Sequence, residues 1–268
     1  MLTTTHHPAR PDYGIDAPGV VRNLLLIGIA CIAVWAAAQV GLWPGRIDML
    51  VSGTPVSIEF KSAGLFLGAD CLAIAAWMLW DSLHGKVLVR ERLMDRLHWT
   101  GSERVLDVGC GRGLMLVGAA KRLVTGKATG IDLWQAEDLS GNGPDATLEN
   151  ARREGVADRV EILTCDMRDM PFRDATFDVI VSRAAIHNLY SPKERAAAVR
   201  EIARVLADGG SVLIRDIRHG HEYLRELAAA GCTSIERLDS PWISFVATVM
   251  TFGSLQPITL LARKTTAP

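Results

Sequence analysis

The sequence predicts an α/β fold, with a doubly wound and mostly parallel sheet preceded by two transmembrane helices. Two observations predict it. Between residues 103 and 268, five short apolar segments alternate with stretches of helical periodicity, a pattern typical of strand–helix repeats in a parallel sheet. Within residues 23–80, two further segments are apolar over roughly twenty residues each, which is long enough to cross a bilayer as helices.

The 268 residues have room for one domain and an appendage, and we expect four regions. These are an N-terminal cytoplasmic leader (1–22), a two-helix transmembrane hairpin (23–80), an amphipathic juxtamembrane helix and linker (81–102) and an α/β domain (103–268). A net charge of −1 without a basic tail argues against a nucleic-acid partner. The five cysteines form no C-x-x-C pair and have no His at metal-ligand spacing, so we expect free thiols in a reducing compartment and no metal.

The first apolar segment is NLLLIGIACIAVWAAAQVGLW (23–43) and the second is SAGLFLGADCLAIAAWMLW (62–80). Both end in Trp, which is favoured at the headgroup level. A cleaved signal peptide is the alternative for the first segment, and a pair of buried helices in a soluble protein is the alternative for both. Four basic residues follow the second segment: Lys86, Arg90, Arg92 and Arg96. In the loop that connects the two segments, two basic residues are offset by two acids. This asymmetry predicts a two-pass membrane protein with the α/β domain in the cytoplasm.

Asp70 is the one charged residue in the second segment and would lie near the middle of the bilayer. A charge there is costly unless it faces the partner helix, a neighbouring protomer or a watery cavity. The alternative is a protonated acid bonded to a backbone carbonyl or to Gln39. We therefore expect either a polar site, with the helices able to form a homo-oligomer, or a neutral side chain without function.

Residues 81–102 have the periodicity of an amphipathic helix. Four apolar residues share one face: Leu83, Val87, Met94 and Leu97. Three basic residues lie nearer the other face: Lys86, Arg90 and Arg96. The pattern fits a helix on an anionic membrane surface, and equally a core-packing helix with a solvated basic face.

The stretch VLDVGCGRG (105–113) predicts a buried strand that ends in a tight loop before a helix. Gly109, Gly111 and Gly113 permit positive φ and lack Cβ atoms, so a ligand can approach the backbone closely. The start of the following helix favours a negative group. The spacing differs from the G-x-G-x-x-G of dinucleotide-binding loops, which disfavours a nicotinamide-dependent reductase. A purely structural turn is the alternative.

Acids follow the next strands as well. Asp132 ends the segment ATGID, where a carboxylate can accept the hydroxyls of a ribose at the ligand crevice. Asp166 follows RVEILTC, and two more strands are expected in FDVIVSR and SVLIRDI. The D-x-G-x-G-x-G motif and the order of these segments resemble the class I S-adenosylmethionine methyltransferases, specifically methyltransferase type 11-like domains.

That resemblance implies a Rossmann-like sheet of seven strands, S-adenosyl-L-methionine as cofactor and S-adenosyl-L-homocysteine as product. It implies that Asp107 fixes the glycine loop and the amino end of the methionine, while Asp166 and the amide of Met167 read the adenine. Arg183 and Arg112 are expected at the methionine carboxylate, with a solvent-facing Arg112 as the alternative. The expected cofactor site comprises Asp107, Gly109, Cys110, Gly111, Gly113, Asp132, Leu133, Asp166, Met167 and Arg183.

His187, just past the fourth strand, is the candidate general base, because its ordinary pKa suits neutral operation. The alternative is a packing or loop-holding role. Trp134 opens a long connection that could cover the adenosine, or it anchors that connection structurally. The tail is expected to form the closing antiparallel strand pair of the family. Its apolar middle, WISFVATVMTF (242–252), is expected as a buried strand, with a membrane-facing surface or an acceptor pocket as alternatives.

Together these features predict a membrane-anchored methyltransferase for a small, apolar or membrane-associated acceptor such as a lipid or quinone. Membrane lipids are expected as further partners. One alternative is a methyltransferase for a small thiol or metalloid, and another is a membrane protein that binds S-adenosylmethionine without turnover. Since S-adenosylmethionine is made in the cytoplasm, the predicted orientation also supplies the cofactor.

Overall fold

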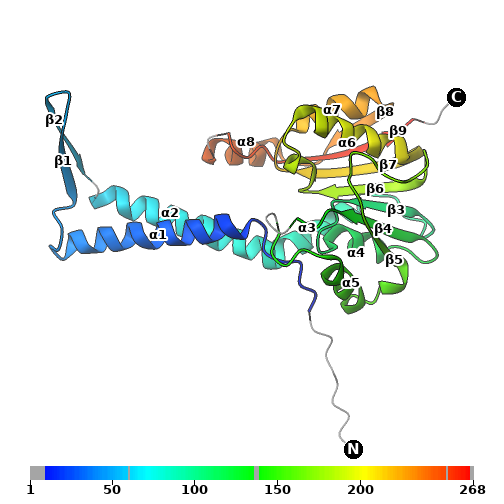
Figure 1. Cartoon of the computed structure of the whole chain (residues 1–268), viewed down its shortest axis with the longest axis horizontal. Helices are drawn as coiled ribbons and strands as arrows, with labels where there is room; N and C mark the ends of the chain where they lie inside the picture. Colours follow the sequence, from blue (N-terminus) through cyan, green and yellow to red (C-terminus); the bar gives the residue numbers. More distant parts are fainter. Residues whose placement is uncertain (1–9, 60, 136–138, 252, 266–268) are drawn as a thin grey trace, which may run out of the picture. The chain divides into compact units, whose positions relative to one another are not determined.

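The computed structural model describes residues 10–59, 61–135, 139–251 and 253–265, which form two compact units. An α/β unit takes the described parts of Met1–Tyr13, Val87–Ala136 and Gly141–Pro268. A helical unit takes those of Gly14–Lys86 and Glu137–Ser140. The α/β unit therefore begins at Val87 rather than residue 103, and it includes a short segment from before the first helix (Figure 1).

The α/β unit is built on a seven-stranded sheet in the order β5-β4-β3-β6-β7-β9-β8 (Figure 1). Its strands are β3 (Arg104–Val108), β4 (Lys127–Asp132), β5 (Val160–Thr164), β6 (Phe177–Arg183), β7 (Leu206–Asp216), β8 (Cys232–Arg237) and β9 (Ile258–Lys264). The first five run parallel to one another, and β9 is antiparallel to both of its neighbours. The predicted mostly parallel, seven-stranded sheet is thus confirmed.

Both faces of this sheet are buried, because alternate strand residues point to opposite sides. Leu106 and Ile180 belong to one core cluster, together with residues of α6 (Pro192–Val205) and α7 (Gly220–Ala229). Val105 and Val179 belong to a second cluster, together with residues of α3 (Lys86–Met94), α4 (Leu114–Ala120) and α5 (Pro144–Arg153). The sheet therefore lies between two helical layers, and its strand ends are left for ligands.

The carboxyl ends of the five parallel strands meet at one edge of the sheet. Asp216, which ends β7, pairs with Ile258 at the start of β9, and Arg237 at the end of β8 pairs with Leu260. The connection from β8 to β9 therefore lies at the same edge. We call it the carboxyl edge.

That connection corrects the buried strand expected within residues 242–252. The antiparallel pair of β8 and β9 is present, but the segment between them forms helix α8 (Pro241–Met250). Its polar residues Ser244, Thr248 and Thr251 recur at spacings of four and three, which is a helical and not a strand period. Pro241 occupies the first turn, where a helix tolerates proline.

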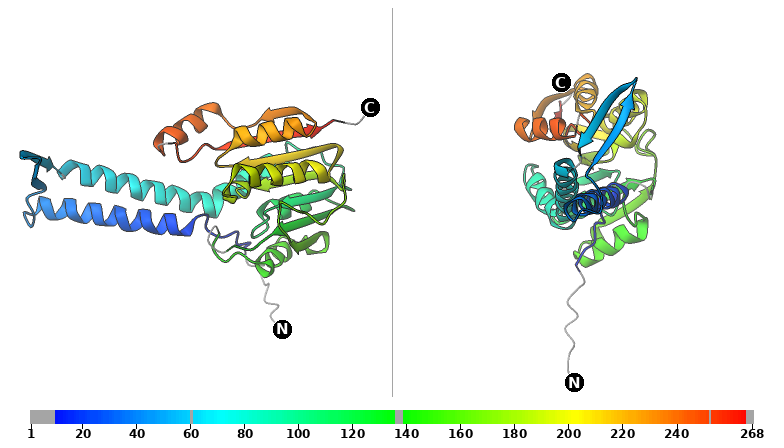
Figure 2. Two further views of the ribbon diagram at one scale, coloured as in Figure 1. Left: turned by 45° about the horizontal axis from the view of Figure 1, so that its top comes forward. Right: turned by 90° about the vertical axis from the view of Figure 1, so that its left-hand side faces the viewer.

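The helical unit contains α1 (Pro18–Gln39) and α2 (Lys61–Trp80), joined by the hairpin of β1 (Arg46–Val51) and β2 (Thr54–Glu59) (Figure 2). The two helices pack closely through glycines. A Cβ on Gly68 would lie 2.8 Å from a side-chain atom of Ile32 and 3.0 Å from the carbonyl oxygen of Gly28. Gly64 and Gly68 form a G-x-x-x-G pair, a spacing typical of helix contacts in membranes.

Among the residues that the structure describes, two helices are long and apolar enough to cross a membrane, judged by length and composition. Pro18–Gln39 has a mean hydropathy of 2.1 with 11% of its window buried, and the continuous helix Ser62–Met94 has 1.7 with 22% buried. The second helix widens into a π-helical turn at Asp81–Gly85 before α3. Such low burial is unlike the core helix of a soluble protein, which is mostly buried.

Asp70 is exposed on the surface of α2, so it does not face the partner helix α1. Two of the three basic residues expected on a solvated or lipid-facing surface of residues 81–102 are buried instead. Lys86 and Arg90 are each 2% exposed, whereas Arg96 is exposed as expected. The Lys86 ammonium donates to the Gly14 carbonyl at 2.7 Å and pairs with Asp16, and Arg90 pairs with Glu154 at 3.2 Å. Ion pairs with these residues stabilise the buried cations, and sequence periodicity gives no sign of such pairs.

Candidate functional site

The glycine loop lies at the carboxyl edge, between β3 and α4. Gly109, Gly111 and Gly113 have φ values of 72°, 53° and 82°, the left-handed region that favours glycine. A Cβ on Gly109 would come within 2.2 Å of the Cβ of Ala185, which follows β6. The N–H groups of Gly109 and Cys110 donate to the Ile131 carbonyl at 2.9 and 3.0 Å. The loop thus presents bare backbone that is fixed to the neighbouring strands.

Asp107 lies beneath this loop and is 1% exposed. Its Oδ2 accepts the Leu116 N–H at 2.7 Å, whereas its Oδ1 has no partner among the described residues. Burial, helped by the negative charge of the nearby Asp132, raises the pKa of this carboxyl to about 8. A buried carboxylate oxygen without a partner fits the ammonium group of an amino-acid ligand. The residues present therefore suit the methionine end of S-adenosylmethionine.

Asp132 ends β4 and holds the loop from its other side. Its Oδ2 accepts the Gly111 N–H at 2.8 Å, and its Oδ1 accepts the Trp134 N–H at 2.6 Å. Each carboxylate oxygen has a second lone pair for a further donor, such as a ribose hydroxyl. The neighbouring Leu133 side chain is 48% exposed and can contact a ligand.

Asp166 lies two residues beyond β5 and pairs with Arg168. The Nη2 of Arg168 donates to Asp166 Oδ2 at 2.6 Å, and its Nε lies 3.0 Å from both carboxylate oxygens. Hydrogen bonds from Arg168 lower the pKa of Asp166 and keep it ionised. Arg168 also pairs with Glu194 on α6. Met167 is partly buried against the core, and so its backbone position is well defined.

Three further candidates occupy different positions. Cys110 is 5% exposed, and burial raises the pKa of its thiol, so it packs in the loop as a neutral side chain. Arg183 ends β6 at the carboxyl edge and is partly buried. The Arg112 guanidinium binds Asp12, with Nη2 donating to Asp12 Oδ2 at 2.7 Å and Nε to the Asp12 carbonyl at 2.8 Å. Arg112 therefore neither faces bulk solvent nor stands ready for a carboxylate.

Asp12 belongs to an N-terminal strap, residues 10–13, which the sequence did not predict at this site. Asn150 on α5 donates to both the Asp12 carbonyl, at 2.7 Å, and the Arg112 carbonyl, at 2.9 Å. The Tyr13 hydroxyl donates to Glu154 at 2.8 Å. The segment just before the first apolar helix is thereby bonded to the glycine loop.

His187 lies in a 3₁₀ turn after β6 and is bound by Asp216. The Nδ1 of His187 is 2.5 Å from Asp216 Oδ1, and the His187 backbone N–H donates to Asp216 Oδ2 at 3.1 Å. The buried Asp216 also accepts the Tyr223 hydroxyl at 3.0 Å and the Ile217 N–H at 2.8 Å. Burial and the Asp216 charge raise the pKa of Tyr223, which stays a donor. This network fixes the imidazole ring.

Asp216 was missed by the sequence reasoning, although a signal for it exists. It is the last residue but one of SVLIRDI, and acids also end or follow preceding strands at this edge. Trp134 was expected either to cover the adenosine or to anchor its connection. Its indole N–H donates to Thr164 Oγ1 at 2.8 Å, which is an anchoring contact to the end of β5. Residues 136–138 of the expected cover lie outside the described residues.

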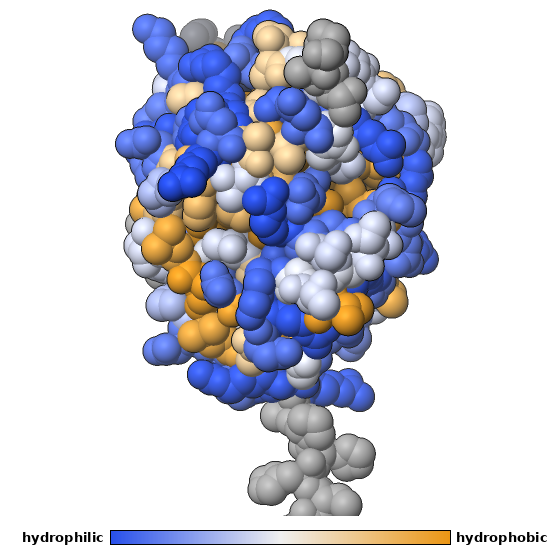
Figure 3. Space-filling model, turned by 90° about the vertical axis from the view of Figure 1, so that its right-hand side faces the viewer, coloured by the Kyte–Doolittle hydropathy of each residue, from blue (hydrophilic) through white to orange (hydrophobic). Residues whose placement is uncertain are grey.

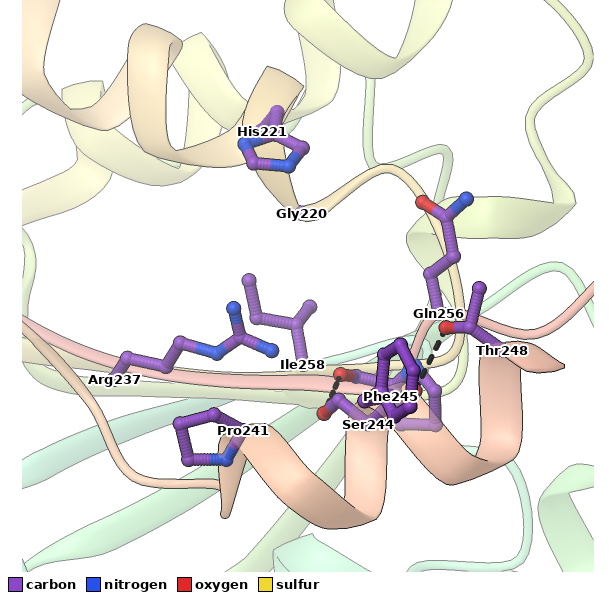
Figure 4. A pocket seen from close by; sticks show the side chains of 10 residues that line it. Gly220, His221, Arg237, Pro241, Ser244, Phe245, Thr248, Gln256 and Ile258 are labelled. Atoms are coloured by element: carbon purple, nitrogen blue, oxygen red, sulfur yellow. Dashed lines mark hydrogen bonds between the residues drawn. The ribbon is translucent and has the colours of Figure 1, made fainter. Parts of the chain in front are cut away.

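A cavity of about 350 Å³ opens at the carboxyl edge between α7, α8 and the start of β9 (Figure 4). Its lining includes His221 from α7, Phe245 and Thr248 from α8, Ile258 from β9 and Arg237 at the end of β8. The lining combines apolar side chains, such as Phe245 and Ile258, with polar ones, such as His221 and Arg237. Within the part of the chain that the structure describes, no cluster of three acidic, His or Cys side chains could hold a metal, and the five cysteines are free.

Comparisons with known proteins agree with this geometry. A family model described as a methyltransferase domain matches residues 106–214. Methyltransferase GfsG of Streptomyces halstedii is 34% identical over 47% of this chain and 42% of its own length. Sterol 4-C-methyltransferase strm-1 of Caenorhabditis elegans is 31% identical over 53% and 37%. The quinone C-methyltransferase UbiE of Roseobacter denitrificans is 30% identical over 54% and 51%. The chain thus spans about half or less of the length of these relatives.

Among solved structures, a geranyl diphosphate methyltransferase in complex with S-adenosylmethionine has a TM-score of 0.54. The likeness covers 70% of this chain and 89% of that one at 22% sequence identity, so it speaks for the fold. Residues 106–214, which hold the glycine loop, Asp107, Asp132 and His187, are therefore similar in sequence to methyltransferase domains, and the fold around them is like that of a solved methyltransferase.

Proposed function

We propose that the protein is a membrane-anchored methyltransferase that transfers the methyl group of S-adenosylmethionine to a small, apolar or membrane-associated acceptor, such as a lipid or quinone. The observation that carries the proposal is the partnerless buried oxygen of Asp107 beneath a backbone loop of three glycines at positive φ. An ammonium and a carboxylate attached to one carbon suit such a site, since the acid takes the cation and the bare loop admits the rest.

The cofactor lies across the carboxyl edge in this proposal. Asp107 accepts the amino group, the loop from Gly109 to Gly113 passes along the methionine, and Asp132 accepts the ribose hydroxyls. Asp166 and the Met167 amide read the adenine, Leu133 covers its face, and Arg183 lies near the methionine carboxylate. Cys110 contributes packing. Arg112 acts from further out, through the N-terminal strap.

Methyl transfer needs alignment above all. S-adenosylmethionine supplies a methyl carbon activated by the sulfonium, and the acceptor lone pair forms the new bond while the carbon–sulfur bond breaks and its electron pair stays on sulfur. Positioning of this kind contributes about 7–11 kcal/mol to lowering the barrier. The acceptor's proton, if it carries one at the reacting atom, passes to His187. Because Asp216 keeps the other imidazole proton on Nδ1, the Nε2 lone pair is the acceptor.

Membrane anchoring by α1 and α2 is supported by their length, their low burial and the glycine contacts between them. Exposed Arg92 and Arg96 beyond the second helix favour a cytoplasmic α/β unit. Among the relatives, one acts on sterols and one on quinone precursors by name, and both kinds of acceptor are apolar. An acceptor held in the bilayer explains why a methyltransferase carries such helices.

The exposed Asp70 supports a homo-oligomer through the helical unit. An acid that faces lipid near the bilayer centre is costly, and a second copy of α2 would supply a polar partner. In this proposal Asp70→Asn weakens cross-linking between copies in the membrane, whereas Asp48→Asn, in the exposed β1–β2 hairpin, leaves it unchanged. Equal cross-linking of both variants and the wild type would contradict an oligomer through Asp70.

The experiment that tests the proposed function uses membranes containing the full chain and methyl-labelled S-adenosylmethionine. We expect label in a small product that partitions into the organic phase. Asp107→Asn should abolish it, whereas Asp158→Asn, at an exposed acid away from the carboxyl edge, should not. Label only in a water-soluble product would favour a thiol or metalloid acceptor. Binding of the cofactor without any labelled product from membrane extracts would favour a non-catalytic protein.

A further inference from the structure

Helix α8 exposes an apolar face. Trp242, Phe245 and Val249 are 70%, 58% and 55% exposed. Their spacings of three and four residues place them on one side of the helix. The Trp242 and Phe245 rings stack with centroids 5.8 Å apart. Three large apolar side chains therefore form one continuous surface, which we call the α8 face.

A buried polar residue holds α8 to the α/β unit. Ser244 is 7% exposed, and its hydroxyl lies 2.7 Å from Asp239 Oδ2. The same hydroxyl lies 2.8 Å from the Pro257 carbonyl oxygen (Figure 4). Asp239 in turn accepts the Thr259 N–H at 2.8 Å. A surface helix of a soluble protein normally buries its apolar side and exposes its polar one. Helix α8 instead exposes three large apolar side chains and buries the polar Ser244, which is bonded in place.

The sequence around α8 lacks charge. From Ser240 to Ala262 there is no Asp, Glu, Lys or Arg. The face of the α/β unit seen in Figure 3, by contrast, carries mostly hydrophilic side chains with small scattered apolar groups. Part of this run is the buried strand β9, but α8 itself is uncharged and exposed. Such a helix suits the boundary between lipid headgroups and acyl chains, where Trp is enriched.

Helix α8 lies close to the candidate site. Because β8 ends and β9 begins at the carboxyl edge, α8 lies at the same edge as His187 and Asp216. Phe245 belongs both to the α8 face and to the lining of the cavity between α7 and α8. An apolar molecule that leaves a bilayer at the α8 face would reach this cavity without crossing water.

We propose that α8 is an interfacial membrane contact, in which Trp242, Phe245 and Val249 enter the headgroup region of the bilayer and deliver an apolar acceptor to the cavity. The inference rests on the proposed membrane anchoring, since helices that cross the bilayer keep the α/β unit within reach of its surface. A bilayer, and not a second copy of the chain, is the chosen occupant because the surface is narrow, uncharged and tipped by Trp.

The test places a photoreactive benzoylphenylalanine at position 245 of the full chain, reconstituted in phosphatidylcholine–phosphatidylglycerol vesicles. The same residue at position 124 is the control, because Val124 is 79% exposed and precedes β4 at the opposite edge of the sheet. On irradiation we expect at least fivefold more lipid adduct at 245 than at 124. Position 249 serves as a second probe, and S-adenosylmethionine binding verifies that each variant is folded.

Two results would overturn the α8 contact while membrane anchoring stands: equal lipid adducts at 245 and 124, or cross-links from 245 that join two copies of the chain. Extraction with alkaline carbonate examines the anchoring separately. If carbonate releases the chain from the vesicles, anchoring by α1 and α2 is wrong. Lipid adducts at 245 and 249 that persist in such a peripheral protein would still support α8 as a contact.

Discussion

Among the residues of the expected cofactor site, Gly109 has the strongest structural requirement for glycine. It combines a φ of 72° with a Cβ position only 2.2 Å from the Ala185 Cβ, so an alanine would strain the backbone and also push β3 and β6 apart. Gly155 has a similar φ of 71° but nothing within 4 Å, so it isolates the backbone cost.

Gly155→Ala should therefore cost about 1–2 kcal/mol, the usual penalty of a left-handed conformation for an L-residue. Gly109→Ala should cost more and should weaken S-adenosylmethionine binding at least tenfold. Thermal unfolding and a cofactor titration of both variants measure the two effects. Equal losses of stability and affinity in the two variants would mean that the close approach to Ala185 has no role.

Substitutions of His187 and Asp216 distinguish a general-base role of His187 from a packing role. Asp216 fixes the tautomer and orientation of the imidazole, so Asp216→Asn should lower kcat nearly as much as His187→Ala. For an acceptor that must lose a proton, general-base loss is worth about 10²–10⁴-fold in rate. Cofactor affinity should stay within threefold of wild type. Loss of cofactor binding with an unchanged kcat at saturation would assign His187 to loop support instead.

The raised pKa of Asp107 makes the stability of the folded protein depend on pH. Its pKa in the folded, ligand-free protein is raised to about 8 by burial, above its unfolded value. The folded state thus keeps a proton that the unfolded state has released, and the resulting stability is present at acid pH and lost as pH rises toward 8. Asp107→Asn removes this loss, so its Tm relative to wild type should rise between pH 5 and pH 8. A Tm difference independent of pH would contradict the burial of an unpaired carboxyl.

Among the helices and strands, sequence reasoning succeeded where both faces of a strand are buried and failed where periodicity was hidden or the partners lie far away in sequence. The central strands are continuous apolar runs that end in Gly or acids, and these fix both the sheet and the positions of Asp107 and Asp132 at its edge. Helix α8 was expected as a strand because its apolar content hid the helical spacing of Ser244, Thr248 and Thr251. Burial of Lys86 and Arg90 depends on Asp16 and Glu154, which lie far from them in sequence.

The contact between α1 and α2 depends on glycine. A side chain at Gly68 would meet Ile32 and the Gly28 backbone at 2.8–3.0 Å, whereas Gly19 has open space around it. Gly68→Val should therefore separate the helices and cost about 1–3 kcal/mol, as overpacking does. Gly19→Val should cost nothing measurable. Thermal unfolding in lipid nanodiscs, followed by helical circular dichroism, compares them, and equal midpoints would contradict close packing at Gly68.

At the scale of the whole molecule, a methyltransferase domain and a pair of apolar helices are joined in one chain. The class of cofactor could be predicted from the glycine loop and the acids after the strands, because short motifs determine backbone recognition. The N-terminal strap could not, since Asp12 contacts Arg112 only after the chain has folded. Asp216 has a signal in its position at the end of a strand, but its contact with His187 forms only with the sheet. The acceptor could not be predicted from either, because the cavity proposed to receive it is built from α7, α8 and β9 together.

In the proposed function, the carboxyl edge of this sheet holds S-adenosylmethionine through Asp107 and the glycine loop. Calorimetric titration of the full chain in nanodiscs measures this binding. We expect one saturable site for S-adenosylmethionine and for S-adenosylhomocysteine, no heat with NAD, and affinity reduced at least tenfold in Asp107→Asn. Binding of NAD, or no heat with either form of the methyl donor, would contradict it.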